Sequence, residues 1–235
     1  MRSPAEALRK VQVGLNGGTP EEALEAARTL QECWMTAGSA EAMYALRDRP
    51  DQVPEAVRKA MDNQGGVNQA IKFAEGQARR CQVFDPATMS RRLELFQRAH
   101  AGGAEGAATE YLSALQSPLE KQKPDPALVA KLQADVRNAA LAGDTLALQH
   151  LRLASGESAS GLGVTPMQRD AYHTAWKTIM DERYPGVADI IEKAMQPFAQ
   201  PASAPALSTA EQAEANALAR QIVETWRRKR KDGKP

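Results

Sequence analysis

The chain has 235 residues, and its 30 Lys and Arg residues nearly balance 29 Asp and Glu residues, which leaves a net charge of +1. This balance excludes a protein that binds nucleic acid or anionic membranes through its overall charge. Aromatic residues make up only 5% of the chain, and Ala and Leu dominate its 43% apolar share. This composition favours helix nearly throughout. No apolar run approaches the roughly 18 residues of a membrane span.

Proline and capping residues mark helix starts at the beginning of the chain. Ser3-Pro4 and Thr19-Pro20 each place a capping hydroxyl before a Pro at the first helical position, where the ring supplies the helical φ. The first pair predicts a short helix that ends before Asn16-Gly17-Gly18. The second predicts a half-buried helix closed by Gly38, and a partner helix follows over residues 39–48.

The next predicted pair of helices starts at Pro54 and turns at Gly65-Gly66. Its second helix carries apolar residues at steps of four, three, four and three, which is the spacing of one buried face. These residues are Val67, Ile71, Ala74, Ala78 and Cys81.

The stretch from Asp85 to Leu151 contains the same markers twice. Asp85-Pro86-Ala87 returns 40 residues later as Asp125-Pro126-Ala127, and Gly103 returns as Gly143. The Asp carboxylate caps the free amides of the first turn, and Gly adopts the left-handed conformation that closes a helix. Each repeat is therefore predicted to be helix, tight turn, helix.

A fifth unit opens at Thr165-Pro166 and turns at Tyr184-Pro185-Gly186. Its first helix is expected to bury Tyr172, Ala175, Trp176 and Ile179, and its second to bury Val187, Ile190, Ile191 and Ala194. The predicted fold is all-α: a right-handed array of about five helical hairpins, as an α-solenoid or a compact bundle, plus a C-terminal helix. The predicted organisation is a hairpin domain over 1–198, a Pro/Ala linker over 199–207, an amphipathic helix over 208–230 and a basic tail over 231–235.

The segment Ala37-Gly38-Ser39-Ala40-Glu41-Ala42-Met43-Tyr44-Ala45-Leu46 resembles the joint between helices in SEL-like repeats, the bacterial relatives of tetratricopeptide repeats. Residues 142–151 and 103–107 are looser copies. The Leu-Gly-x-x-Tyr opening and the Gly-Val-x-x-Asp insertion of that family are absent. The resemblance implies a non-catalytic scaffold whose concave face holds a peptide or protein partner, and no binding residues carry over from the family.

The two cysteines, Cys33 and Cys81, lie on predicted apolar helical stripes. They fit either one disulfide in an exported protein or two buried thiols in a cytosolic one. A disulfide would require Cα atoms within roughly 7 Å. The expected compartment is periplasmic or exported if a leader was removed and the pair is bridged, and cytoplasmic otherwise. Neither cysteine has a second Cys or His at ligand spacing, so no metal site is expected.

Four arginines flank the predicted corner between Cys81 and Asp85, and they could grip a carboxylate or phosphate. They could equally form a solvated edge paired with Glu75 and Glu94. The candidate binding residues are Arg79, Arg80, Arg91 and Arg92, together with the aromatic residues Tyr172 and Trp176.

The sequence offers no catalytic residue and no cofactor motif. His100, His150 and His173 lie far apart, and no glycine-rich phosphate loop follows a strand. The leading hypothesis is a protein that binds a protein or peptide partner across a groove formed by the first helices. One alternative is a helical-bundle enzyme, favoured if His100 or His173 lies within about 4 Å of a buried carboxylate in a pocket. Another is a nucleic-acid or anionic-surface binder using the basic residues 227–231. Oligomeric state stays open.

Overall fold

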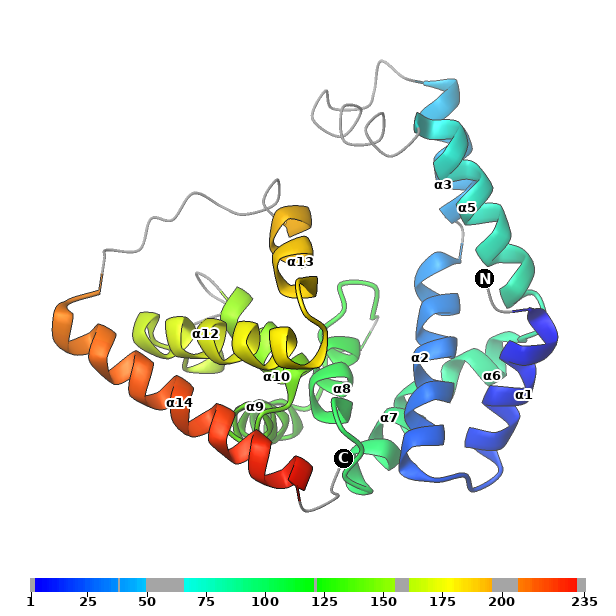
Figure 1. Cartoon of the computed structure of the whole chain (residues 1–235). Helices are drawn as coiled ribbons and strands as arrows, with labels where there is room; N and C mark the ends of the chain where they lie inside the picture. Colours follow the sequence, from blue (N-terminus) through cyan, green and yellow to red (C-terminus); the bar gives the residue numbers. More distant parts are fainter. Residues whose placement is uncertain are drawn as a thin grey trace. The chain divides into compact units, whose positions relative to one another are not determined.

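The structure, a computed structural model, describes residues 3–37, 39–49, 66–120, 122–154, 161–195 and 207–231. Throughout these residues the regular secondary structure is helix and contains no strand, so the predicted all-α class is confirmed (Figure 1). None of the helices described combines the length and apolarity that a membrane crossing requires. The predicted helix start at Pro54 and most of the Pro/Ala linker lie outside the described residues.

The helices gather into two compact units. Unit 1 comprises Met1–Ala107 and Ser117–Lys121, and unit 2 comprises Ala108–Gln116 and Gln122–Pro235. The chain therefore leaves unit 1, forms one helix of unit 2, and returns briefly to unit 1. The repeat domain expected over residues 1–198 and its handedness stay predictions.

Unit 1 is built around one central helix, α2. Its helices are α1 (Pro4–Leu15), α2 (Pro20–Thr36), α3 (Ser39–Asp48), α5 (Gly66–Cys81), α6 (Pro86–Ser90) and α7 (Arg92–Ala101). Helix α2 packs against α1, α5, α6 and α7, whereas α3 packs against α5. Small and branched side chains of α2 fill the resulting core, among them Ala23, Ala26, Ala27 and Leu30, each with no exposed area.

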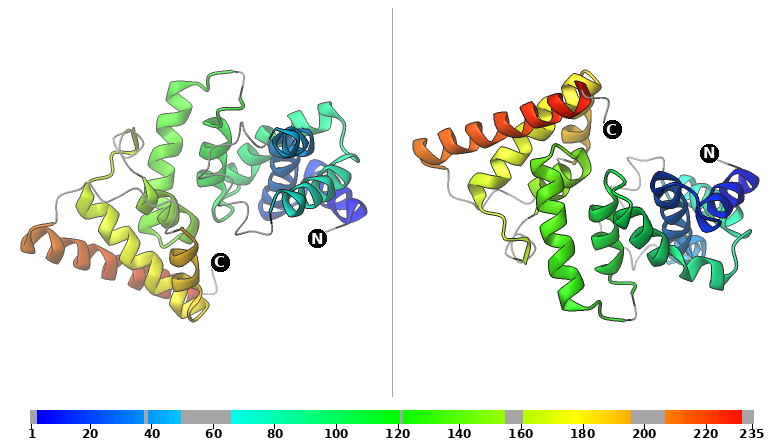
Figure 2. Two further views of the ribbon diagram at one scale, coloured as in Figure 1. Left: turned by 90° about the horizontal axis from the view of Figure 1, so that it is seen from above. Right: turned by 90° about the horizontal axis from the view of Figure 1, so that it is seen from below.

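Unit 2 is arranged around α12. Its helices are α8 (Ala107–Leu115), α9 (Pro126–Leu141), α10 (Thr145–Leu153), α12 (Pro166–Arg183), α13 (Val187–Met195) and α14 (Thr209–Lys231). Helix α12 packs against α10, α13 and α14, and α9 packs against α10 and α14. Both views in Figure 2 show α12 (yellow) side by side with α14 (orange to red). The apolar face of α14 is thus covered mainly by α12, the first helix of the last hairpin.

The helix starts predicted from prolines are confirmed, because α1, α2, α6, α9 and α12 all begin at Pro. The capping groups also act as expected. The Thr19 hydroxyl accepts from the amide of Glu22 while the Glu22 carboxylate accepts from the amide of Thr19, and the Asp85 carboxylate accepts from the amide of Thr88. These bonds, which are reciprocal between Thr19 and Glu22, satisfy amides that the helix itself leaves free.

Two expectations about the helices are wrong. Residues 86–101 form two helices and not one. The helix is interrupted at Arg91, where the amide bonds to the Thr88 carbonyl in a tighter turn. The Ser90 hydroxyl donates to the Ala87 carbonyl at 2.7 Å and so competes with regular helix bonding there. Helix α3, expected to pair with the helix before it, takes α5 as its main partner instead.

The apolar stripe predicted for α13 is also only partly buried. Val187 and Ile191 are half-buried, but Ile190 is 66% exposed and Ala194 is exposed. The fully buried residue is Ala188, which the predicted stripe did not include. The reason is that α13 packs mainly on α12, so its far side has no core to enter.

The turn between α9 and α10 touches α14 at a position where only glycine fits. Gly143 has φ of +86°, and a Cβ there would lie 2.5 Å from the Cβ of Trp226. Trp226 is itself 7% exposed. The absence of a side chain at residue 143 therefore sets how closely the turn and α14 approach.

We expect Gly143→Ala to destabilise the protein more than Gly186→Ala. Gly186 has φ of +80°, but a Cβ there would meet no atom within 4 Å. Both variants carry the cost of left-handed backbone, about 1 kcal/mol, and Gly143→Ala adds an overpacking cost of about 1–3 kcal/mol. Urea unfolding followed by circular dichroism measures the difference, and equal losses would contradict the packing described.

Candidate functional site

The four arginines, for which either a shared ligand or a solvated edge paired with Glu75 and Glu94 was expected, each face a different acidic residue of unit 1. Exposed Arg79 lies 3.9 Å from Glu75. Nε and Nη2 of Arg91 donate to the two oxygens of the Glu94 carboxylate at 2.9 and 2.8 Å. Arg80 pairs with Glu32, and Arg92 pairs with Glu120. The arrangement does not direct the four guanidinium groups toward one point.

Arg92 is buried, and its side chain contacts residues of other segments of unit 1. Its guanidinium lies 3.9 Å from the centre of the Trp34 ring, and its Nε donates to Gln31 at 3.0 Å. Its Nη2 pairs with Glu120, in the short segment by which the chain returns to unit 1. Arg92 thus joins α7 to α2 and to that segment.

Tyr172 and Trp176 lie in the core of unit 2, 2% and 1% exposed. Burial raises the pKa of the Tyr172 hydroxyl. The Arg152 guanidinium lies 3.8 Å from the centre of the Trp176 ring. These two aromatic side chains therefore present little surface to an incoming partner.

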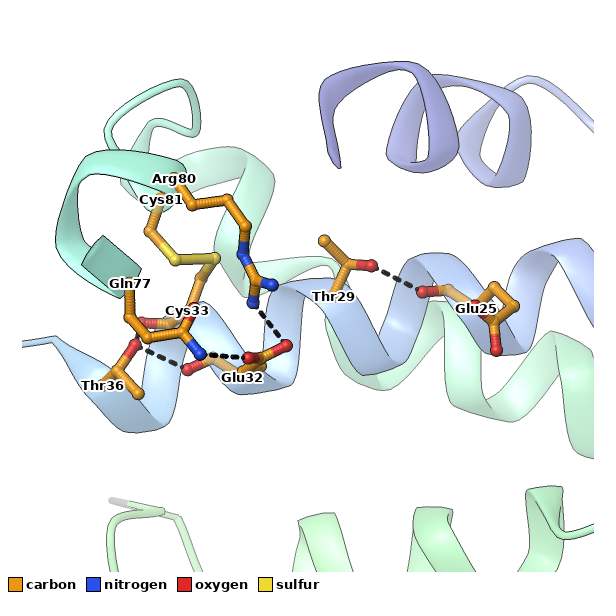
Figure 3. The surroundings of a disulfide bond; sticks show 8 residues. All are labelled: Glu25, Thr29, Glu32, Cys33, Thr36, Gln77, Arg80 and Cys81. Carbon is orange, nitrogen blue, oxygen red and sulfur yellow. Dashed lines mark hydrogen bonds and ion pairs between the residues drawn. A yellow bond between two sulfur atoms is a disulfide. The ribbon is translucent and has the colours of Figure 1, made fainter. Parts of the chain in front are cut away.

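Cys33 of α2 and Cys81 of α5 form a disulfide, with Cα atoms 5.3 Å apart (Figure 3). This distance agrees with the limit of roughly 7 Å expected for a bridged pair. Cys33 is 1% exposed, so the crosslink lies against the core of unit 1.

Glu32, the neighbour of Cys33, joins the same two helices by polar contacts. In Figure 3, Gln77 and Arg80 of α5 both reach its carboxylate, and the Gln77 amide donates to Oε1 at 2.7 Å. The hydroxyl of Thr36 donates to the Glu32 carbonyl at 2.8 Å. The disulfide and these bonds hold the C-terminal half of α5 against α2.

A pocket of about 470 Å³ lies between α3 and α5, next to the end of α2. Its lining residues are Thr36, Ser39, Met43, Gly66, Gln69, Ala70, Phe73, Ala74 and Gln77. The lining is mainly apolar, and Phe73 is 55% exposed. Thr36 and Gln77 belong both to this pocket and to the bonded group around the disulfide. The anchored end of α5 is therefore also a wall of the pocket.

One polar group in the pocket is still available for bonding. The Ser39 hydroxyl oxygen is buried and has no hydrogen-bond partner among the residues described. A buried hydroxyl without a partner costs free energy, so a ligand group that bonds to it gains affinity. Among the lining residues that the structure describes, none carries an ionisable side chain that could act as an acid or base.

The histidines lie outside this pocket. His173 Nε2 is 3.4 Å from a Glu192 oxygen, and its Nδ1 is 3.2 Å from Nη1 of Arg152. His150 lies in the last turn of α10, and His100 in the last turn of α7. In the part of the chain described, no three His, Cys, Asp or Glu side chains gather as a metal would require.

No family model, curated protein or solved structure matches this chain. The site is therefore assigned from its own geometry. Sequence reasoning identified the cysteine pair but missed the pocket. The available signal was Phe73, a large aromatic residue next to the predicted buried stripe of α5 but not on it.

Removing the crosslink should destabilise unit 1. A disulfide between residues 48 positions apart stabilises by about 4 kcal/mol in the chain-entropy model. We expect Cys33→Ala/Cys81→Ala, and the wild-type protein treated with a reductant, to unfold at lower urea concentration. Thiol titration of denatured protein purified without reductant should find no free thiol, and two free thiols would contradict the disulfide.

Unfolding should become easier as pH falls from 7 to 5. Burial lowers the pKa of both His150 and His173 below the ordinary 6.5. The unfolded state therefore takes up protons first, and the stability present above pH 6.5 is lost as pH falls toward the folded pKa values. Urea titrations across this range measure the effect. In the double variant His150→Gln/His173→Gln, the loss of stability between pH 7 and 5 should be smaller. An unchanged loss would mean that other groups cause it.

Proposed function

We propose that the protein is a non-catalytic binding protein that takes an apolar segment of a protein or peptide partner into the pocket between α3 and α5. The observation that carries the proposal is the apolar lining with half-exposed Phe73. A volume of about 470 Å³ lies in the range of about 300–1,000 Å³ typical of binding sites.

The two walls of the pocket suit a helical ligand. An amphipathic helix laid along two neighbouring helices buries side chains at positions i, i+3, i+4 and i+7. Met43 of α3 and Ala70 and Phe73 of α5 supply the apolar contacts, while the Ser39 hydroxyl supplies one polar contact. The described part of the lining is uncharged, which suits an apolar ligand segment.

The resemblance to SEL-like repeats points in the same direction. Two lining residues, Ser39 and Met43, lie in residues 37–46, which carry that resemblance. A groove along the first helices of successive repeats stays a separate prediction. The disulfide supports an oxidising compartment, such as the periplasm or the cell exterior, as the place of action.

An enzyme is the second candidate, because His173 lies 3.4 Å from Glu192, within the distance set for that alternative. The Glu192 side chain is 29% exposed, however, whereas the alternative required a buried carboxylate in a pocket. A catalytic His–carboxylate pair keeps its other ring nitrogen directed at the substrate. In this protein that nitrogen faces the Arg152 guanidinium at 3.2 Å. The geometry therefore favours a structural role for His173.

Peptide capture tests the proposal. A library of amphipathic peptides is selected on the oxidised protein, and the best binder is titrated against Phe73→Asp and Ile190→Asp. We expect Phe73→Asp to weaken binding by about tenfold or more, as loss of a central aromatic contact does. Ile190→Asp changes a similarly exposed apolar residue outside the pocket and should leave affinity unchanged. Equal affinity for Phe73→Asp and the wild type would refute the site.

A further inference from the structure

Arg152 of unit 2 and Arg92 of unit 1 are both buried against a Trp ring, but their bonding differs. Each guanidinium lies over a Trp ring, at 3.8 Å from Trp176 and 3.9 Å from Trp34. Arg152 is 9% exposed and Arg92 is 5% exposed. Arg92 pairs with Glu120, whereas the hydrogen-bond contact of Arg152 is the His173 ring.

The difference lies on one edge of the guanidinium. Nε and Nη2 point the same way and form the fork that binds a carboxylate with two parallel bonds. In Arg91, Arg92 and Arg227 both nitrogens of this fork contact side-chain oxygens of Glu or Gln residues. Nε and Nη2 are buried without a hydrogen-bond partner in both Arg80 and Arg152. Nη2 of Arg80 still forms an ion pair with Glu32, whereas Arg152 forms no ion pair among the residues described.

Such a fork is costly to leave unbonded. A buried donor without an acceptor loses its bonds to water and gains none in return. Burial also lowers the pKa of Arg152, which agrees with a charge that its surroundings compensate incompletely. A carboxylate placed on the fork would remove both penalties at once.

We propose that Arg152 anchors a carboxylate-binding site in unit 2, with Trp176 beneath the guanidinium and His173 beside it. The ligand is a carboxylate because the filled forks of Arg91 and Arg227 in this same chain each hold one. It comes either as a small free acid or as the carboxylate end of a peptide. This site is separate from the pocket between α3 and α5 and does not depend on it.

Helix α13 carries the acidic residue whose charge acts on Arg152. Glu192 of α13 contacts His173 and Lys177 but makes no hydrogen bond to Arg152, although its charge acts on Arg152. Ala188 is the α13 residue that is fully buried, and Lys177 holds the helix through Asp189 at 2.8 Å. A carboxylate ligand on the fork would bring a second negative charge to Arg152, where it competes with that of Glu192.

Nuclear magnetic resonance of the full chain tests the site. The indole N–H signal of Trp176, assigned by Trp176→Phe, is followed while sodium acetate is added, with sodium chloride at matched ionic strength as control. A dipeptide with a free C-terminus and its amide form the second pair of probes. We expect a saturable shift with acetate or the free dipeptide, and none with chloride or the amide.

Two variants decide whether Arg152 is responsible. Arg152→Met keeps the length and the apolar contact but should abolish the saturable shift. Glu192→Gln should tighten binding several-fold, because it removes a competing negative charge while the fold is retained. A shift that survives in Arg152→Met, or the lack of any saturable shift in both wild type and Glu192→Gln, overturns the proposal. Should Arg152→Met fail to fold, Glu192→Gln alone decides, and unchanged or weaker binding there also overturns it.

Discussion

The attachment of α5 to α2 is the constraint on which the candidate pocket depends. Cys33 and Cys81 join the two helices covalently, and Glu32 joins them again through Gln77 and Arg80. Because α3 packs on α5, this attachment also fixes both walls of the pocket relative to the core of unit 1. The pocket thus adjoins the crosslinked part of the core through Thr36 and Gln77.

The features that depend only on residues close in the sequence, such as the helix starts, could be predicted from the sequence. Capping by Thr19 and Asp85 involves atoms only three residues away, so the local sequence is sufficient to place those helix starts. The choice of packing partner is different, because it depends on residues far along the chain. The pairing of α3 with α5, and the exposure of Ile190 on α13, could not be read from a helical pattern, which indicates an apolar face but not what covers it.

The candidate site was predictable to a similar, limited extent. Two cysteines on apolar stripes left the disulfide open, since a sequence does not give the distance between two helices. The arginines around residues 79–92 were identifiable as a cluster, but their partners were not, because Glu32 and Glu120 come from distant segments. The pocket itself is a space between α3 and α5, and no residue pattern encodes the width of such a space.

The pairing of Arg92 with Glu120 limits how this protein can be divided. Glu120 belongs to unit 1 but follows α8, most of which belongs to unit 2. A fragment cut at residue 107 would therefore keep Arg92 buried against Trp34 while losing its counter-charge. A fragment that contains the first half of the protein therefore has to extend to residue 121. Such a fragment includes α8 but lacks the rest of unit 2, to which most of α8 belongs.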